Sequence, residues 1–369
     1  MALSILTFAI VTIAVQIRST VAESVSSFKV VNLVGSKGTH ARRTDSKMIN
    51  AWGATFIAAN GGTPFWINDE GTGFSELIDG KGKIFKALPF VTIPGPTAGS
   101  TGKPTGIVGN ITGQFAIPGS TSALFIFSTE QGTILGWNGG TTATTIVTNA
   151  GKDYTGLALA NTGTVNQLYA ANAAAPGSID VFDANFNPVT TTGGFTDPNL
   201  PAGFTPYNIN TIEGNLFVTY SMGTQAVGQV DEFSPDGTLI MTFTDASLNA
   251  PWGLTLAPSH FGTFSGDLLV GNKGDGTISV FNPANAEFLG QLADKDSNPI
   301  VIQDVWTLID GAGAVNATAD AVYFTAGTGG YAEGVFGTIE AGPEVKVKAT
   351  KTPKPTKTPK PHSMMPGMM

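Results

Sequence analysis

The chain has 369 residues, of which 47 are glycine, 12% are charged and none is cysteine. This composition disfavours a helical protein and excludes disulfides and cysteine-ligated metals. Residues 23–342 contain 12 basic and 26 acidic residues, a formal charge of −14, so long-range repulsion disfavours nucleic acid as a partner.

The N-terminus resembles a secretory signal. The apolar segment 5–15 has the length of a signal-peptide core and is short for a bilayer span. Thr20 and Ala22 are small residues at suitable offsets for cleavage after Ala22. We therefore predict a signal peptide at 1–22 and a secreted, extracellular protein, with a retained N-terminal anchor as the alternative. No later segment has the length and hydrophobicity of a membrane span.

The rest of the body is organised as a repeat. Six short phrases share one position, and successive copies lie 45 to 54 residues apart. Each copy continues with a second strand-like stretch, a glycine-containing loop and a third stretch, and five copies add a turn and a fourth stretch. Short strands separated by such turns predict antiparallel sheets. The shared positions are Gly53, Gly106, Gly156, Asn208, Gly253 and Thr307.

Four-stranded units of this size match the blades of a β-propeller. We therefore predict an all-β, six-bladed β-propeller over 23–342, made of four-stranded antiparallel blades. A linear solenoid is the alternative, but it needs polar capping units that the sequence lacks. The sixth unit has no fourth stretch, so we expect the N-terminal strand 28–34 to complete the last blade and close the ring. The expected blades span about 48–93, 102–147, 153–195, 204–243, 249–292 and 301–340.

The most distinctive phrase is Asn-Ala-Trp-Gly at 50–53, which recurs as Asn-Ala-Pro-Trp-Gly at 249–253. We expect it in the innermost strand of a blade, where glycine permits close approach of neighbouring strands and tryptophan buries a large area. The tryptophans are predicted to wedge between adjacent blades. The expected structural residues of the inner strands are Trp52, Gly53, Trp252, Gly253 and Trp306.

Polar residues gather where second strands end and the following loops begin. These loops all fall on one face, called face A; the opposite face is face B. A ring of Asn68, Ser128, Asn172, Tyr220 and Asn272 is expected there. Amide and carboxylate oxygens suit Ca²⁺ or another divalent cation. Alternatively, each asparagine only satisfies the backbone of its turn. The candidates for ligand or cation binding are Asn68, Glu70, Glu130, Asn172, Asn272 and Asp275.

Catalytic signatures are sparse. The body contains only His40 and His260, too few for a three-histidine zinc site, and no Gly-x-Ser-x-Gly phrase. His260 is expected in a first-to-second-strand loop and hence on face B. We predict no catalytic residues.

The C-terminal segment 343–369 contains six lysines and four prolines between 353 and 361. Proline at this density blocks helix and sheet, so a disordered tail is predicted. A glycosylated stalk that contacts a cell wall or matrix is the alternative. Asn110 and Asn316 begin Asn-x-Thr sequons and are glycosylation candidates in a eukaryotic source.

Several long phrases support a resemblance, among them STEQGTILGWN (128–138) and NAPWGLTLAPSHFGTFSGDLLVGNKGDGTISVFNP (249–283). They resemble a family of uncharacterised secreted proteins, mainly bacterial, over roughly 28–340. More distantly, the blades are similar to NHL-repeat propellers and to gluconolactonase/regucalcin-like hydrolases. The latter resemblance implies a divalent metal held by an inner-strand Glu, but Asn50 stands at that place.

The expected function is therefore a non-catalytic propeller that binds an unknown protein or polysaccharide, possessing no membrane span once the signal is removed. We expect a monomer. The alternative is a metal-dependent lactonase or esterase that uses the face A ring. A third hypothesis assigns polysaccharide binding to the lysine-rich tail.

Overall fold

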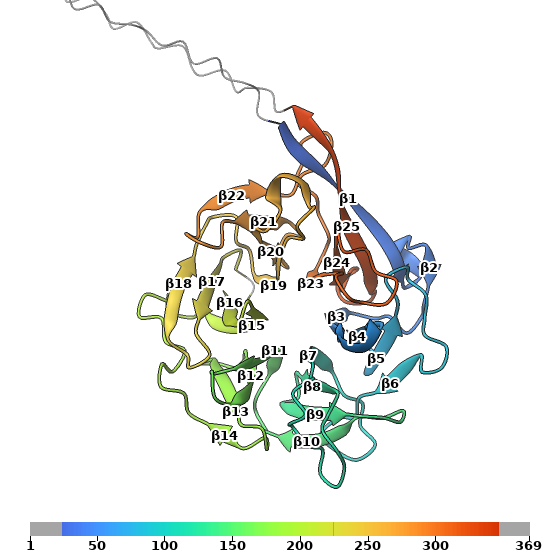
Figure 1. The fold of residues 1–369 in the computed structure, drawn as a ribbon, viewed down its shortest axis with the longest axis vertical. Coiled ribbons are helices and arrows are strands. Elements are labelled where there is room, and N and C mark those ends of the chain that lie inside the picture. The colour runs from blue at the N-terminus through green and yellow to red at the C-terminus, as the bar shows by residue number, and fades with distance from the viewer. Residues whose placement is uncertain (1–23, 224, 347–369) are drawn as a thin grey trace, which may run out of the picture.

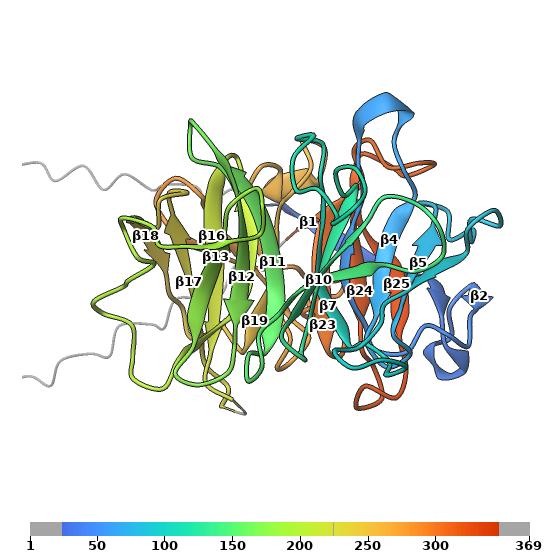
Figure 2. The same cartoon turned by 90° about the horizontal axis from the view of Figure 1, so that it is seen from below.

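The computed structural model describes residues 24–223 and 225–346, and these form six sheets around a central axis (Figures 1 and 2). Blade 1 contains β3 (Ala51–Thr55), β4 (Phe65–Asp69), β5 (Phe74–Ile78) and β6 (Phe90–Thr92). Blade 2 contains β7 (Pro104–Gly109), β8 (Phe125–Thr129), β9 (Thr133–Trp137) and β10 (Thr144–Thr148). Blade 3 contains β11 (Tyr154–Asn161), β12 (Asn166–Asn172), β13 (Ser178–Phe182) and β14 (Pro188–Val189).

Blades 4 to 6 continue the ring in chain order. Blade 4 contains β15 (Thr205–Ile212), β16 (Asn215–Ser221), β17 (Gly228–Phe233) and β18 (Leu239–Phe243). Blade 5 contains β19 (Pro251–Leu256), β20 (Leu268–Asn272), β21 (Ile278–Phe281) and β22 (Phe288–Gln291). Blade 6 contains β23 (Val305–Asp310), β24 (Ala321–Ala326) and β25 (Val335–Lys346). Three short 3₁₀ turns, η1 (Lys37–Thr39), η2 (Ala59–Gly61) and η3 (Gly262–Phe264), lie in loops.

The ring is closed by the N-terminal strand, and the predicted six-bladed propeller is thereby confirmed. β1 (Ser24–Gly35) pairs antiparallel with β25, and the short β2 (Arg43–Thr44) extends the sheet in parallel. Because the last blade combines both ends of the chain, opening the ring requires breaking this ladder. β25 continues through Lys346, so the first four residues of the expected tail belong to the sheet. The expected signal peptide and the tail beyond Lys346 lie outside the described residues.

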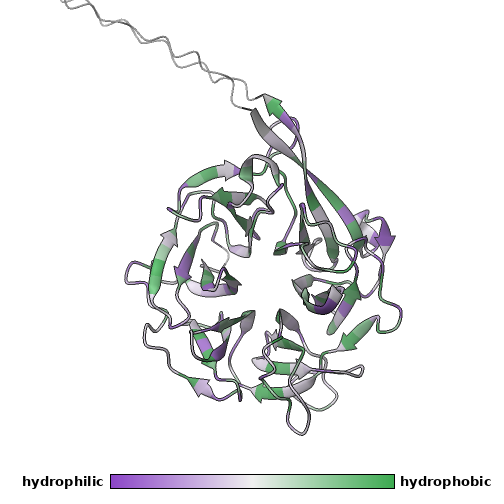
Figure 3. Cartoon of the chain, in the orientation of Figure 1, coloured by the Kyte–Doolittle hydropathy of each residue, from purple (hydrophilic) through white to green (hydrophobic). Residues whose placement is uncertain are grey.

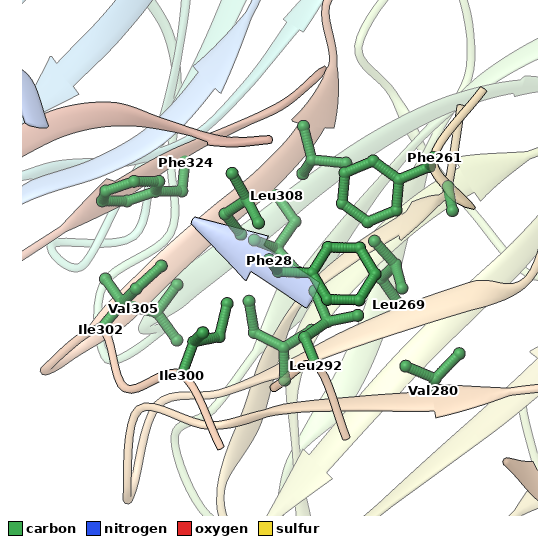
Figure 4. Close-up of a cluster of buried hydrophobic side chains, with 14 of the residues drawn as sticks. Phe28, Phe261, Leu269, Val280, Leu292, Ile300, Ile302, Val305, Leu308 and Phe324 are labelled. Atoms are coloured by element: carbon green, nitrogen blue, oxygen red, sulfur yellow. The ribbon is translucent and has the colours of Figure 1, made fainter. Parts of the chain in front are cut away.

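Apolar side chains anchor the closing strand. Phe28 of β1 is buried between blades 5 and 6, and its ring centroid lies 4.9 Å from that of Phe261 (Figure 4). Its backbone N–H donates to the Ala293 carbonyl at 2.8 Å, which also ties β1 to the preceding blade. Hydrophobic segments of this kind occur in every blade (Figure 3). The cores between adjacent blades therefore hold the ring together without cysteine.

All six inner strands carry a register irregularity at the repeated phrase. The ladder with the second strand skips one or two residues around each shared position, for instance between Ala51 and Ala54 and between Pro251 and Gly253. A β-bulge bends the strand and turns a side chain away from its regular direction. The repeated Trp-Gly phrase thus marks a bulge beside the axis.

Glycine at the shared position permits close contact between blades. A Cβ on Gly53 would overlap the Thr105 carbonyl oxygen of blade 2, and one on Gly253 would overlap the Trp306 carbonyl oxygen of blade 6. These contacts are with backbone, which cannot move aside as a side chain can. The packing role expected for these two glycines therefore has a direct steric cause.

Where the shared position is polar, its side chain bonds to the next blade. Asn208 Nδ2 donates to the Trp252 carbonyl at 2.7 Å, and the Thr307 hydroxyl donates to the Trp52 carbonyl at 2.9 Å. The innermost strand is the edge of its sheet, and half of its backbone groups lack a partner strand. Side chains from a neighbouring blade satisfy part of that edge.

Candidate functional site

The three inner-strand tryptophans form a plug across the axis, called the tryptophan plug. Trp52 and Trp306 stack with ring centroids 3.7 Å apart, and Trp252 meets both rings edge-on. Trp252 Nε1 donates to the Thr155 carbonyl of blade 3 at 3.1 Å. The tryptophans therefore do not wedge between adjacent blades as predicted, because the bulge directs them to the centre of the ring.

The plug divides the axis into two unequal parts. Below it lies a channel with a volume of about 350 Å³, lined by the inner strands of all six blades. Its lining runs from Gly53, Gly106 and Trp252 near the plug to Glu213 and Asp310 at the face B ends of β15 and β23. The channel consequently opens on face B, and face A carries a mouth that ends on the tryptophan plug.

A hydrogen-bonded chain connects the plug with the face A mouth. Trp306 Nε1 donates to Asn50 Oδ1 at 2.9 Å, and Asn50 Nδ2 donates to Glu70 Oε2 at 2.9 Å. Lys103 Nζ then bridges Glu70 Oε1 at 2.7 Å and Glu130 Oε2 at 3.3 Å. Blades 6, 1 and 2 are linked by fixed polar contacts, and both ends of the Asn50 amide are already occupied.

The other side of the mouth is built from blades 4, 5 and 6. Lys273 Nζ lies 3.8 Å from Asp304 Oδ1 and 4.9 Å from the centre of the Tyr331 ring. Tyr331 stacks on Trp306, and Tyr207 meets that same indole edge-on at 5.9 Å. Together with the hydrogen-bonded chain, these side chains surround the axis, and this set is called the axial mouth.

Carboxylates outnumber lysines at the axial mouth. Burial raises the pKa of Glu130, and the nearby Glu70 carboxylate raises it further, against the opposing effect of Lys103. Asp153, just before β11, also belongs to the axial mouth: burial raises its pKa, and the nearby Lys103 opposes that rise. Burial raises the pKa of Tyr207, assisted by Tyr331, Glu130, Asp153 and Asp304. The mouth holds four carboxyl groups, on Glu70, Glu130, Asp153 and Asp304, and two lysines, Lys103 and Lys273.

The predicted asparagine ring does not form as one ring. Asn272 and Asn172 pair with the residue two before the shared position, whereas Asn68 lies one residue earlier in its strand. Since successive strand residues face opposite sides, the slip of one residue turns Asn68 toward blade 2. Ser128 is displaced in the same way. The equivalent residues of the six blades are Asp69, Thr129, Asn172, Tyr220, Asn272 and Ala326.

Each asparagine of the predicted ring is engaged in backbone or hydroxyl contacts. Asn68 Nδ2 donates to the Thr105 and Gly106 carbonyls at 2.9 and 3.2 Å. Asn172 Oδ1 accepts from the Asp153 N–H, and Asn272 Oδ1 accepts from the Asn249 N–H. The amides of the latter two donate to Ser178 and Ser279. These contacts favour the interpretation that strand-end asparagines satisfy turns and neighbouring strands.

The remaining predicted candidates separate into two places. Glu70 and Glu130 meet at Lys103, whereas Asp275 caps its own loop by accepting from the Thr277 N–H at 2.9 Å. Within 24–346, apart from residue 224, no group of three or more His, Cys, Asp or Glu side chains is arranged to hold a metal ion. Divalent-cation binding therefore stays a prediction.

Two buried carboxyl groups in blade 1 were not among the predicted candidates. Asp69 and Glu76 lie on the same face of β4 and β5, and they are 0% and 2% exposed. Neither Asp69 oxygen nor Glu76 Oε2 has a hydrogen-bond partner among the described residues. Burial, the neighbouring Glu76 and Asp45 raise the pKa of Asp69 well above its usual range. Burial and Asp45 raise the pKa of Glu76 to about 8.

His260 lies apart from the mouth. Its Nδ1 is 3.1 Å from Asp320 Oδ1, and both side chains are exposed in loops that follow inner strands, as expected for face B. Among the described residues, no helix has the length and hydrophobicity to cross a membrane.

Comparisons with known proteins identify relatives and a fold. No protein-family model matches the sequence. The chain is 30% identical over 339 residues to the uncharacterised protein R648 of Acanthamoeba polyphaga mimivirus, covering 86% of this chain and 81% of that protein. It is 28% identical to the uncharacterised protein L690 of the same virus, covering 86% of each. These relatives are viral, and the expected secreted bacterial family is not confirmed.

A solved structure supports the fold independently. A Bacteroides thetaiotaomicron protein of unknown function aligns with a TM-score of 0.51 and 11% identity, covering 86% of this chain and 77% of that protein. At this identity the likeness concerns the architecture alone.

Proposed function

The chain belongs to the same family as the mimivirus protein R648, and we propose that it is a secreted, non-catalytic propeller that binds a partner at the axial mouth. The observation that carries this proposal is the fixed chain from Trp306 through Asn50 and Glu70 to Lys103 and Glu130. A surface whose charged groups are already held in place loses little side-chain freedom when it binds.

The charge of the mouth defines the chemistry of the partner. Glu70, Glu130, Asp153 and Asp304 face two lysines, so the carboxyl groups of the mouth outnumber its lysines by two. A partner that carries basic groups supplies positive charge. We therefore propose a protein or polysaccharide with exposed amines as the partner.

The double variant Glu130→Gln and Asp153→Asn tests the proposal. An oligolysine peptide and a chitosan oligomer serve as probes in titration calorimetry at low salt. We expect the affinity of the double variant for these probes to be at least about tenfold lower, because two attractive charges are removed while side-chain volume is kept. Glu287→Gln, an exposed change just before the outer strand β22, is the matched control. Equal binding by the native protein, the double variant and Glu287→Gln would exclude the axial mouth as the binding site.

Secretion is proposed from the apolar segment 5–15, which lies outside the described residues. The expected result is a mature protein that begins at Glu23 when the full chain is expressed in a secreting host. N-terminal sequencing of the exported protein measures this directly. An intact N-terminus on a cell-retained protein would contradict cleavage and support the anchor.

A further inference from the structure

The channel on the face B side of the tryptophan plug is a cavity that the proposed function does not use. We propose that it binds a small, uncharged, hydroxyl-rich molecule of monosaccharide or disaccharide size. The plug separates this channel from the axial mouth, so the two sites are independent.

The shape of the channel is that of a blind pocket. Trp252 lies at its inner end, and the stacked Trp52 and Trp306 close the axis on the same side. The volume of about 350 Å³ falls within the range of small-molecule sites, roughly 300–1,000 Å³. A molecule that enters from face B is therefore surrounded by six inner strands and cannot pass through.

The walls carry no positive charge. Among the residues that the structure describes, no Lys, Arg or His lines the channel, and its two carboxylates, Glu213 and Asp310, stand at the outer ends of their strands. Asp310 Oδ1 already accepts from the Ala312 N–H at 2.7 Å. Inside the channel, an anion would find no cationic side chain and a cation would find no carboxylate. A neutral ligand therefore matches the interior.

Hydrogen-bonding groups and apolar surface alternate along the walls. The inner strands are sheet edges, and their unpaired backbone N–H and C=O groups face the axis. The Thr55 hydroxyl has no hydrogen-bond partner among the described residues. Asn210 Nδ2 donates to the Leu254 carbonyl, and Asn210 Oδ1 accepts no hydrogen bond from the described residues. Leu254 and Leu308 supply apolar contact. Sugars present this same combination of hydroxyls and C–H surface.

The loops around the face B mouth differ in length. First-to-second-strand loops are long in blades 1, 2, 5 and 6, and the blade 1 loop with η2 rises above the ring (Figure 2). In blades 3 and 4 the same connections are the short turns 162–165 and 213–214.

The test titrates the full-length protein with glucose, maltose and N-acetylglucosamine, and with glucuronic acid and glucosamine as charged counterparts. We expect saturable binding of at least one neutral sugar, and binding of its charged counterpart at least tenfold weaker. Thr55→Val should weaken binding about fivefold to tenfold through loss of one hydrogen bond. Thr144→Val on the outer strand β10 is the matched control and should bind normally.

Thr55→Trp provides a second, independent measurement, because a large side chain at a lining position narrows the channel. Loss of sugar binding with unchanged circular dichroism supports the proposal. Binding that survives this change, equal binding of charged sugars, or no saturation by any neutral sugar at millimolar concentration would each overturn it. Oligolysine binding at the axial mouth should be unaffected by either Thr55 variant, so failure here is distinguishable from failure of the proposed function.

Discussion

Replacing Trp252 with alanine is expected to lower the free energy of unfolding by about 3–5 kcal/mol. The side chain is 5% exposed, meets Trp52 and Trp306 edge-on, and donates across the axis to the Thr155 carbonyl. The substitution removes the apolar burial, the aromatic contacts and the hydrogen bond together, and it leaves a cavity that the rigid ring cannot fill. Denaturant unfolding followed by tryptophan fluorescence and circular dichroism measures the change.

Two matched variants separate these contributions. Trp252→Phe retains a ring but removes the N–H, so we expect a loss of about 1–3 kcal/mol. Trp137→Ala removes a half-buried tryptophan from the outer part of blade 2 and should cost less than Trp252→Ala. If Trp252→Ala and Trp137→Ala destabilise the protein equally, the plug has no special structural role.

Replacing Glu76 with glutamine is expected to stabilise the protein at alkaline pH by a few kcal/mol and to weaken its dependence on pH. Burial and Asp45 raise the pKa of Glu76 from the ordinary 4.5 to about 8. Between these values the folded state holds a proton that the unfolded state has released. The free energy of unfolding of the native sequence therefore falls as pH rises from about 4.5 to about 8, and levels off above that.

Unfolding curves at several pH values between 4 and 9 measure this effect. Glutamine keeps the volume of Glu76 and needs no proton, so the fall in stability over that window should shrink, leaving the contribution of Asp69. Glu287→Gln, at an exposed position, should leave the pH profile unchanged. A profile that is identical for Glu76→Gln and the native sequence would show that Glu76 is ionised in the folded protein at neutral pH.

Blade 1 differs from blades 3 and 5 in the chemistry of this position. In blade 5 the equivalent pair is Asn272 and Ser279, which bond to one another at 2.9 Å. In blade 3 the residue equivalent to Glu76 is Asp180, which Lys152 neutralises at 2.9 Å. In blade 4 the residue equivalent to Glu76 is Asp231, which is also buried, and burial raises its pKa to about 6. Blade 1 is distinguished by placing two buried carboxyl groups, Asp69 and Glu76, at these positions.

Sequence spacing alone misplaced the polar ring for a specific reason. A pattern of apolar residues locates the end of a second strand only to within one residue. Because successive residues of a strand point to opposite sides, an error of one residue places a side chain on the wrong side. Asn68 was therefore grouped with Asn172 and Asn272 although it faces blade 2. The sequence analysis identified Glu70 and Glu130 of the axial mouth but not its other residues, because the segments that join one blade to the next also end on face A. Polar residues three positions before the shared position of the repeat indicate these segments: Asn50, Lys103, Asp153 and Asp304.

The sequence by itself determined the number of blades, their four-stranded pattern and the closing strand, because these follow from local periodicity repeated six times. It also placed Trp52, Trp252 and Trp306 on inner strands. Only the tertiary structure decided that a bulge in each inner strand brings these rings together across the axis, blocks face A and leaves a channel on face B. The reason is physical: contacts across the axis join residues some 50 to 250 positions apart, as in the bond from Trp306 to Asn50, and no local pattern encodes their geometry.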